Sequence, residues 1–119
     1  MIGTKVDFMN KKIAYIEDCD IDFMQMNRLT GFEMTRFTTL SQFMNQDIHY
    51  DIVISDVILP DFNASLFFDL ADKVYGQNGV LVFYSGCKQP DNIAIKNDGW
   101  FVKGSKDQSI VDFLKKELK

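Results

Sequence analysis

Three acidic residues, one serine and one lysine each follow directly, or almost directly, on a short apolar run of the sequence: Glu17, Asp18, Asp56, Ser85 and Lys103. Clustered carboxylates raise one another's pKa unless a cation joins them, and a hard dication such as Mg²⁺ is the natural partner. A carboxylate can also take a phosphoryl group as an aspartyl phosphate. An ammonium and a hydroxyl would then neutralise and bind the phosphoryl oxygens. These residue types are therefore suited to Mg²⁺-dependent phosphoryl transfer onto a carboxylate.

This chemistry requires that the apolar runs bring the five residues together. The runs have almost no polar alternation, which is typical of parallel strands that are covered on both faces. We expect strands at Ile13–Ile16, Ile52–Ile54, Val80–Tyr84 and Trp100–Val102, with a weaker edge strand within Phe32–Phe37.

Segments with helical spacing of apolar residues alternate with these runs. We expect helices capped at Asp20, at the capping boxes Thr39–Gln42 and Ser105–Gln108, along Leu66–Val74, and, as a short fourth helix, within Pro90–Lys96. The order is a strand followed by a helix, five times over. It predicts a doubly wound α/β fold with right-handed crossovers.

Ligand sites in such sheets lie beyond the carboxyl ends of the strands. Taken singly, each of the five polar residues has an ordinary interpretation as a turn, cap or surface residue. Four separate strands, however, each deliver a group that one phosphoryl-transfer site needs. The combination therefore favours a site over four unrelated turns.

The overall composition narrows the class of protein. The 119 residues predict one domain over 1–119, with 1–10 as an N-terminal extension. A net charge of −4 gives no basic surface for nucleic acid. No apolar run approaches the roughly 20 residues of a membrane helix, and the N-terminus lacks the apolar region of a secretion signal. Two cysteines do not suggest a disulfide framework, so we expect a cytoplasmic protein.

The chain from Lys11 to Lys119 resembles the receiver domain of two-component response regulators. The resemblance is carried by Ile13–Asp18, by Asp51–Pro60 around the acceptor aspartate, by Ser85-Gly86 and by Lys103. It implies a flavodoxin-like fold: a five-stranded parallel sheet in the order 2-1-3-4-5, helices on both faces and a short fourth helix.

The resemblance also implies roles for the site residues. Asp56 would be the phosphoacceptor, and Lys103 would pair with it or with the phosphate. Mg²⁺ would be held by Asp18, Asp56 and the backbone carbonyl of Ile58, with Glu17 acting through a water. The chain would not be an enzyme, because it would assist only its own phosphorylation and dephosphorylation.

A switch and a set of partners follow from the same resemblance. Ser85 would bind the phosphoryl group, and Trp100 would move in response to it. The partners would be a sensor histidine kinase or phosphotransfer protein and an unidentified downstream protein, with neither nucleic acid nor membrane bound directly. Trp100 stands where Tyr or Phe is usual, Gly104 where Pro is usual, and Ala64 where Gly is often found.

Other classes remain open at this point. The chain could be a pseudo-receiver, an interaction module that never uses phosphate. A flavodoxin-like cofactor binder would need a Gly-, Ser- or Thr-rich phosphate loop after the first strand, where this chain has Glu17–Asp20. A phosphatase would need a second acid close after Asp56, and the sequence has none there.

Overall fold

A computed structural model describes residues 11–61, 63–90 and 94–118. The strands form one sheet in the order β2-β1-β3-β4-β5, with every neighbouring pair parallel. They are β1 (Ile13–Ile16), β2 (Thr35–Phe37), β3 (Ile52–Ser55), β4 (Val80–Ser85) and β5 (Gly99–Val102). The helices are α2 (Asp20–Thr30), α3 (Leu40–Met44), α4 (Ala64–Gly76) and α5 (Asp107–Glu117). The predicted flavodoxin-like sheet and its strand order are confirmed.

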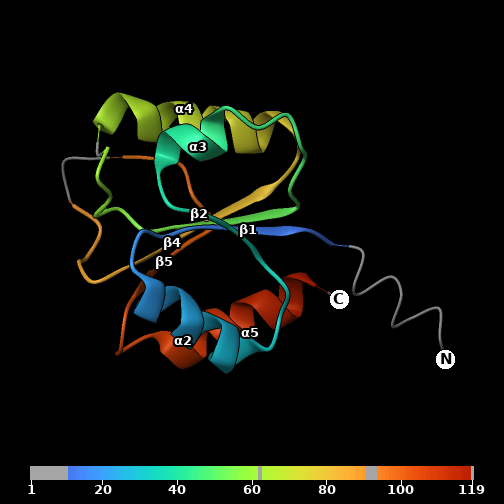
Figure 1. The fold of residues 1–119 in the computed structure, drawn as a ribbon, viewed down its shortest axis with the longest axis vertical. Helices are drawn as coiled ribbons and strands as arrows, with labels where there is room; N and C mark the ends of the chain where they lie inside the picture. Colours follow the sequence, from blue (N-terminus) through green and yellow to red (C-terminus); the bar gives the residue numbers. More distant parts are fainter. Residues whose placement is uncertain (1–10, 62, 91–93, 119) are drawn as a thin grey trace, which may run out of the picture.

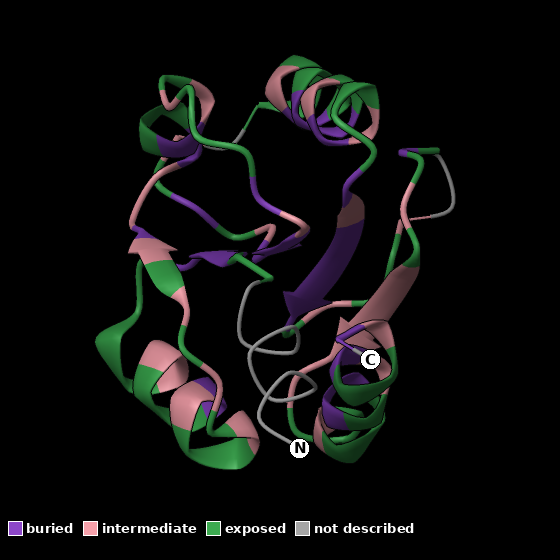
Figure 2. Cartoon of the chain, turned by 90° about the vertical axis from the view of Figure 1, so that its right-hand side faces the viewer, coloured by how far each residue is buried: buried purple, intermediate pink, exposed green. Residues whose placement is uncertain are grey.

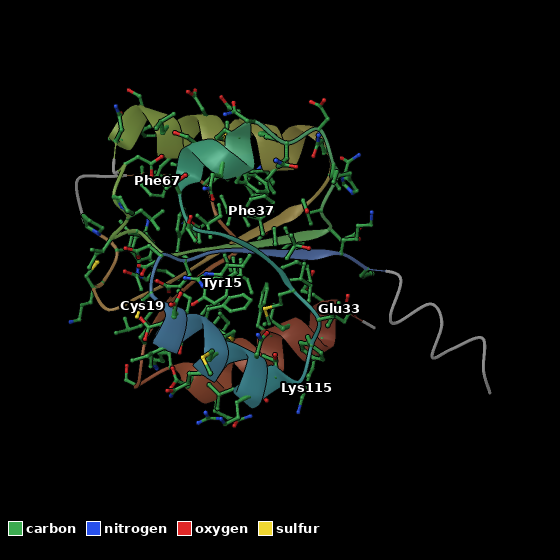
Figure 3. The ribbon with its side chains drawn as sticks, in the orientation of Figure 1. Tyr15, Cys19, Glu33, Phe37, Phe67 and Lys115 are labelled. Carbon is green, nitrogen blue, oxygen red and sulfur yellow. The ribbon has the colours of Figure 1, made fainter. Side chains whose placement is uncertain are left out.

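Helices cover both faces of the sheet, as predicted (Figure 1). Helices α3 and α4 lie on one face, and α2 and α5 lie on the other. Side chains alternate between the faces along each strand. Tyr15 accordingly packs with the core on the α2 and α5 side, whereas Phe37 and Phe67 pack on the α3 and α4 side (Figure 3).

Burial differs sharply between the central and the edge strands (Figure 2). Every residue of β1 and β3 is buried, and so is all of β4 except Val80. The continuous apolar runs of these three strands predicted coverage on both faces, which is confirmed for them; the same prediction for Trp100–Val102 is wrong, because that run is only half-buried. The edge strands are more open: β5 is half-buried throughout, and β2 has only three residues, fewer than the expected Phe32–Phe37 segment.

The start of α3 follows the predicted capping box in part. The Thr39 hydroxyl accepts a hydrogen bond from the Gln42 amide N–H at 3.1 Å, as expected. The Gln42 side chain, however, accepts from the backbone N–H and hydroxyl of Thr38, both at 2.9 Å, and not from the N–H of Thr39. Asp61 adds a second cap, because its carboxylate accepts from the N–H groups of Leu40 and Ser41.

The predicted starts of α2 and α5 are displaced. Cys19 takes the N-cap position of α2, and Asp20 is its first helical residue. The capping box predicted at Ser105–Gln108 is wrong, because residues 103–106 form a turn and α5 begins at Asp107. The Asp107 carboxylate accepts from the Gly104 N–H at 2.8 Å, and this bond closes the turn in place of a serine cap.

The short helix predicted within Pro90–Lys96 is not present in its described part: Pro90 and residues 94–96 are not helical, and residues 91–93 lie outside the described residues. The crossover is held by individual contacts instead. Ile95 is buried against the α3 and α4 face, and the Asp98 carboxylate accepts from the Tyr75 hydroxyl at 2.7 Å. A segment held by such single contacts needs no helical repeat of apolar residues.

Among the described helices, none combines the length and apolar character required to cross a membrane.

Candidate functional site

The backbone places the ends of β1, β3 and β5 at one edge of the sheet. Parallel pairing continues one residue past the strands, because the Asp56 N–H donates to the Ile16 carbonyl at 3.0 Å and the Lys103 N–H donates to the Ser85 carbonyl at 2.8 Å. Asp56 and Lys103 are therefore fixed by the sheet itself. Glu17 joins them because it directly follows β1.

Lys103 is the centre of the site. Its Nζ atom lies 2.6 Å from Glu17 Oε1, 2.8 Å from Asp22 Oδ2 and 2.9 Å from Asp56 Oδ2. These carboxylates raise the pKa of the Lys103 ammonium above its ordinary value, although burial acts in the opposite direction. One cation thus compensates part of the charge of three acids.

Glu17 is completely buried, which is rare for a carboxylate. Its oxygens accept from the Tyr15 hydroxyl at 3.0 Å and from the Cys19 N–H at 3.3 Å, besides Lys103. Burial raises the pKa of Glu17 to about 7 and the charge of Asp56 adds to the effect, while the hydrogen bond from Lys103 counteracts them. The ammonium is shared, so it offsets the cost of burying this charge only in part.

Asp56 lies at the end of β3 with its side chain almost fully buried. Its Oδ1 atom accepts from the N–H groups of Val57 at 2.6 Å and Ile58 at 3.1 Å, while Oδ2 faces Lys103. Burial alone would raise the pKa of Asp56. The bonds from Lys103, Ile58 and Ser85 outweigh it, and the pKa falls below its ordinary value. Asp56 is therefore an ionised carboxylate in a largely buried position.

Glu17, Asp18 and Asp56 each offer a carboxylate oxygen within 4.8 Å of the other two. Asp18 is exposed, whereas its two neighbours are buried, so a cation bound here would keep one side open to water. Hard oxygen donors and room for water are what Mg²⁺ requires, so the residues present fit this ion. The Ile58 side chain is exposed on the loop after Asp56. The ligand role assigned to its carbonyl stays a prediction.

Ser85 and Trp100, the predicted switch pair, lie on neighbouring strands and are linked through Cys87. The Ser85 side chain is buried and its Oγ atom lies 3.5 Å from Cys87 Sγ. The Trp100 indole N–H donates to the Cys87 carbonyl at 2.8 Å, and its ring packs on Phe83 with centroids 4.9 Å apart. The indole is half-buried, and its donor is satisfied in this position.

Gly104 gives the residue after Lys103 a conformation that few other residues adopt. Its φ is 87°, in the left-handed region that favours glycine, and it donates its N–H to Asp107. Proline, which has no N–H and a fixed negative φ, could not take this place. The Lys103 loop is thus built on a different local structure from one that carries proline.

The sequence reasoning missed Asp22 and Tyr15. Asp22 lies in the first turn of α2, and a helix that starts directly after β1 must place that turn at the same edge of the sheet. That geometry was a usable signal. In the sequence, Tyr15 cannot be distinguished from the other core residues of β1. Its hydrogen bond to Glu17 depends on a side-chain rotamer that no sequence pattern specifies.

Comparison with known proteins gives a structural but not a sequence match. No protein-family model matches the chain, and no curated protein is significantly similar to it. The beryllofluoride-activated receiver domain of DrrB, from Thermotoga maritima, superimposes with a TM-score of 0.74 at 16% identity, over 91% of this chain and 97% of that chain.

Two further solved structures agree. The response regulatory domain of mrkE from Klebsiella pneumoniae gives a TM-score of 0.73 at 16% identity, over 88% of this chain and 93% of that one. The chemotaxis response regulator CheY4 of Vibrio cholerae gives 0.68 at 18% identity, over 90% and 98%. The chain therefore has the receiver-domain fold, and the resemblance predicted from its motifs is confirmed at the level of the fold.

Proposed function

We propose that the chain is a phosphoacceptor receiver domain of a two-component phosphorelay, in which Mg²⁺-dependent phosphorylation of Asp56 switches a partner-binding surface. The observation that supports this most strongly is the set of contacts around Asp56. A buried carboxylate receives two backbone N–H groups on one oxygen and the Lys103 ammonium on the other. Glu17 and Asp18 each offer a carboxylate oxygen within 4.8 Å of one on Asp56, close enough for the three acids to share a cation.

The proposed reaction uses the Asp56 carboxylate as the nucleophile. A carboxylate oxygen forms a bond to the phosphorus of the donor, the bond between phosphorus and the donor's leaving atom breaks, and the leaving group departs with that electron pair. Lys103 and the Ser85 hydroxyl hold the oxygens of the transferred group. Mg²⁺, held by Asp18 and Asp56, would neutralise charge on those oxygens when bound.

The partners follow from this reaction. A sensor histidine kinase or phosphotransfer protein would supply the phosphoryl group from a phosphohistidine, and a downstream protein would read the switched surface. The chain would modify only itself, so we do not propose turnover of a separate substrate. The cytoplasm is the compartment that such a relay implies.

Incubation with acetyl phosphate and Mg²⁺ is expected to add one base-labile phosphate to the wild-type protein. Asp56→Asn should accept none at this position, because an amide is not a nucleophile of this kind. Asp47→Asn, which changes an exposed aspartate, should be modified like wild type. Intact-mass spectrometry followed by peptide mapping is the measurement.

The alternative is a pseudo-receiver that binds a partner without phosphate. The crossover between β4 and β5, which shows no helix in its described part, and the satisfied indole of Trp100 favour it. An unmodified wild-type mass, in a protein whose fold is intact by circular dichroism, would select this alternative over phosphorylation.

Slow autodephosphorylation is expected once Asp56 is modified. In receiver domains, the residues two positions after the acceptor and after the Ser or Thr influence the attacking water; here they are Ile58 and Cys87. Neither side chain orients water well. Ile58→Asn should shorten the half-life of the phosphoprotein several-fold. The half-life is measured as the loss of the phosphate mass over time. An unchanged or longer half-life would contradict this account.

Trp100 provides a direct test of the switch, because it is the only tryptophan in the chain. If phosphorylation draws Ser85 inward and displaces the indole from Cys87, beryllofluoride with Mg²⁺ should change the tryptophan emission. Ser85→Ala should reduce that change. Constant emission in a protein that mass spectrometry shows to be phosphorylated would remove Trp100 from the switch.

A further inference from the structure

Lys103 has already used all its hydrogen-bond donors in this structure. An ammonium carries three N–H groups, and here they go to Glu17, Asp22 and Asp56 at 2.6, 2.8 and 2.9 Å. Under the proposed function, the same ammonium must also bind an oxygen of the incoming phosphoryl group. One of the three contacts therefore has to be given up before the ammonium can do so.

The exposure of the three acids identifies the contact that is released at least cost. The Glu17 side chain has no exposed surface, that of Asp56 is 7% exposed, and that of Asp22 is 39% exposed. A buried carboxylate that loses its cation cannot be hydrated, whereas water can replace the cation at a half-exposed one. Asp22 is thus the carboxylate that Lys103 can leave most easily while Asp56 is still ionised, that is, before the phosphoryl group is bonded to it.

We propose that Asp22 is a positioning residue, a latch that occupies one N–H group of Lys103 in the resting state and releases it to the phosphoryl group on Asp56. The inference rests on the proposed function and deepens it. Asp22 does not touch the reacting atoms; it acts only through Lys103. It is also the one contact of the three that comes from a helix, because it stands in the first turn of α2.

This placement has a mechanical consequence. In the resting state, Lys103 ties the start of α2 to the loop between β5 and α5. Release of Asp22 unties them, so the occupancy of Asp56 is transmitted to α2. The signal reaches the surface because an ion pair breaks, and no core side chain has to move for this to happen.

The test measures the phosphorylation rate of the full chain as a function of acetyl phosphate concentration, with Mg²⁺ present. Asp22→Asn removes the latch, so the rate at saturating donor should rise about two- to fivefold, the factor that corresponds to one exposed ion pair. Asp22→Ser should give the same rise, and Asp22→Glu should restore the wild-type rate. A thermal melt of each variant confirms that it is folded.

Asp20→Asn is the matched control. It removes the same charge two residues earlier, from a carboxylate that pairs with Arg36 at 2.6 Å and does not contact Lys103. A general effect of charge on an anionic donor would lower the half-saturating concentration in both variants and leave the saturating rate unchanged. That result, or a saturating rate in Asp22→Asn equal to or below wild type, overturns the latch.

Failure of the proposed function would look different. In that case wild type and all variants remain unmodified at every donor concentration, and the latch proposal is wrong together with the proposed function. If wild type is phosphorylated but Asp22→Asn shows no gain in the saturating rate, only the latch proposal is wrong and the proposed function stands.

Discussion

Replacement of Lys103 by Met should lower the free energy of unfolding by about 3 kcal/mol at neutral pH when divalent cations are removed with EDTA. The variant keeps most of the aliphatic stem but removes the only cation that contacts the carboxylates of Glu17, Asp22 and Asp56 among the described residues. Glu17 and Asp56 would then be buried with no cation beside them. Removing one partner of a buried ion pair costs more than the pair itself contributes, because the remaining charge is left without compensation.

Urea denaturation followed by circular dichroism measures this loss. Lys115→Met, on the exposed side of α5, makes the same chemical change without a buried partner and should alter stability by less than about 0.5 kcal/mol. The double variant Lys103→Met/Glu17→Gln should regain part of the loss, since a buried amide at position 17 needs neither a cation nor the uptake of a proton. A Lys103→Met protein as stable as Lys115→Met would show that the ammonium does not compensate the acids.

In EDTA, the wild-type protein should become less stable as the pH rises from about 4.5 to about 7. Burial raises the pKa of Glu17 from 4.5 to about 7 in the folded chain, so the folded state keeps a proton that the unfolded state has already released. Stability falls with pH wherever the folded state binds more protons. A shift of this size corresponds to at most about 3 kcal/mol across the window.

The ionisation of Asp56 affects stability in a different pH range. Its pKa is lowered from 3.8, so the stability it contributes is lost only as the pH falls below that value, and the two effects separate. Glu17→Gln should flatten the slope between about pH 4.5 and 7, whereas Glu33→Gln, at an exposed position, should keep it. Urea midpoints measured across the window provide the test. A wild-type slope that Glu17→Gln leaves unchanged would assign it to another group.

The fold was predictable because its signals are local. Continuous apolar runs such as Ile52–Ile54 are typical of strands that are covered on both faces, and they alternate with helical stripes. The meeting of Glu17, Asp56 and Lys103 was predictable for a related reason: the carboxyl ends of parallel strands share one edge. The residues needed only to follow their strands directly.

What could not be predicted depends on contacts across the fold. Helix α5 begins later than predicted because Asp107, and not Ser105, closes the turn with Gly104. The crossover before β5 was expected to be helical, yet it is held by contacts to residues on other elements, such as that between Asp98 and Tyr75. Such a contact between distant segments leaves no periodic trace in the sequence.

The uneven burial of the sheet also bears on how the protein opens. Local unfolding proceeds most easily where few apolar contacts are lost, and β5 is the half-buried edge strand next to the buried β4. Lys103 follows β5, while Glu17 and Asp56 follow the buried strands β1 and β3. Detachment of β5 alone would therefore withdraw the cation and leave the acids in place. The backbone amides of the strand that supplies the positive charge would then be less protected than those of the central strands, and the site could come apart while the central strands remain paired.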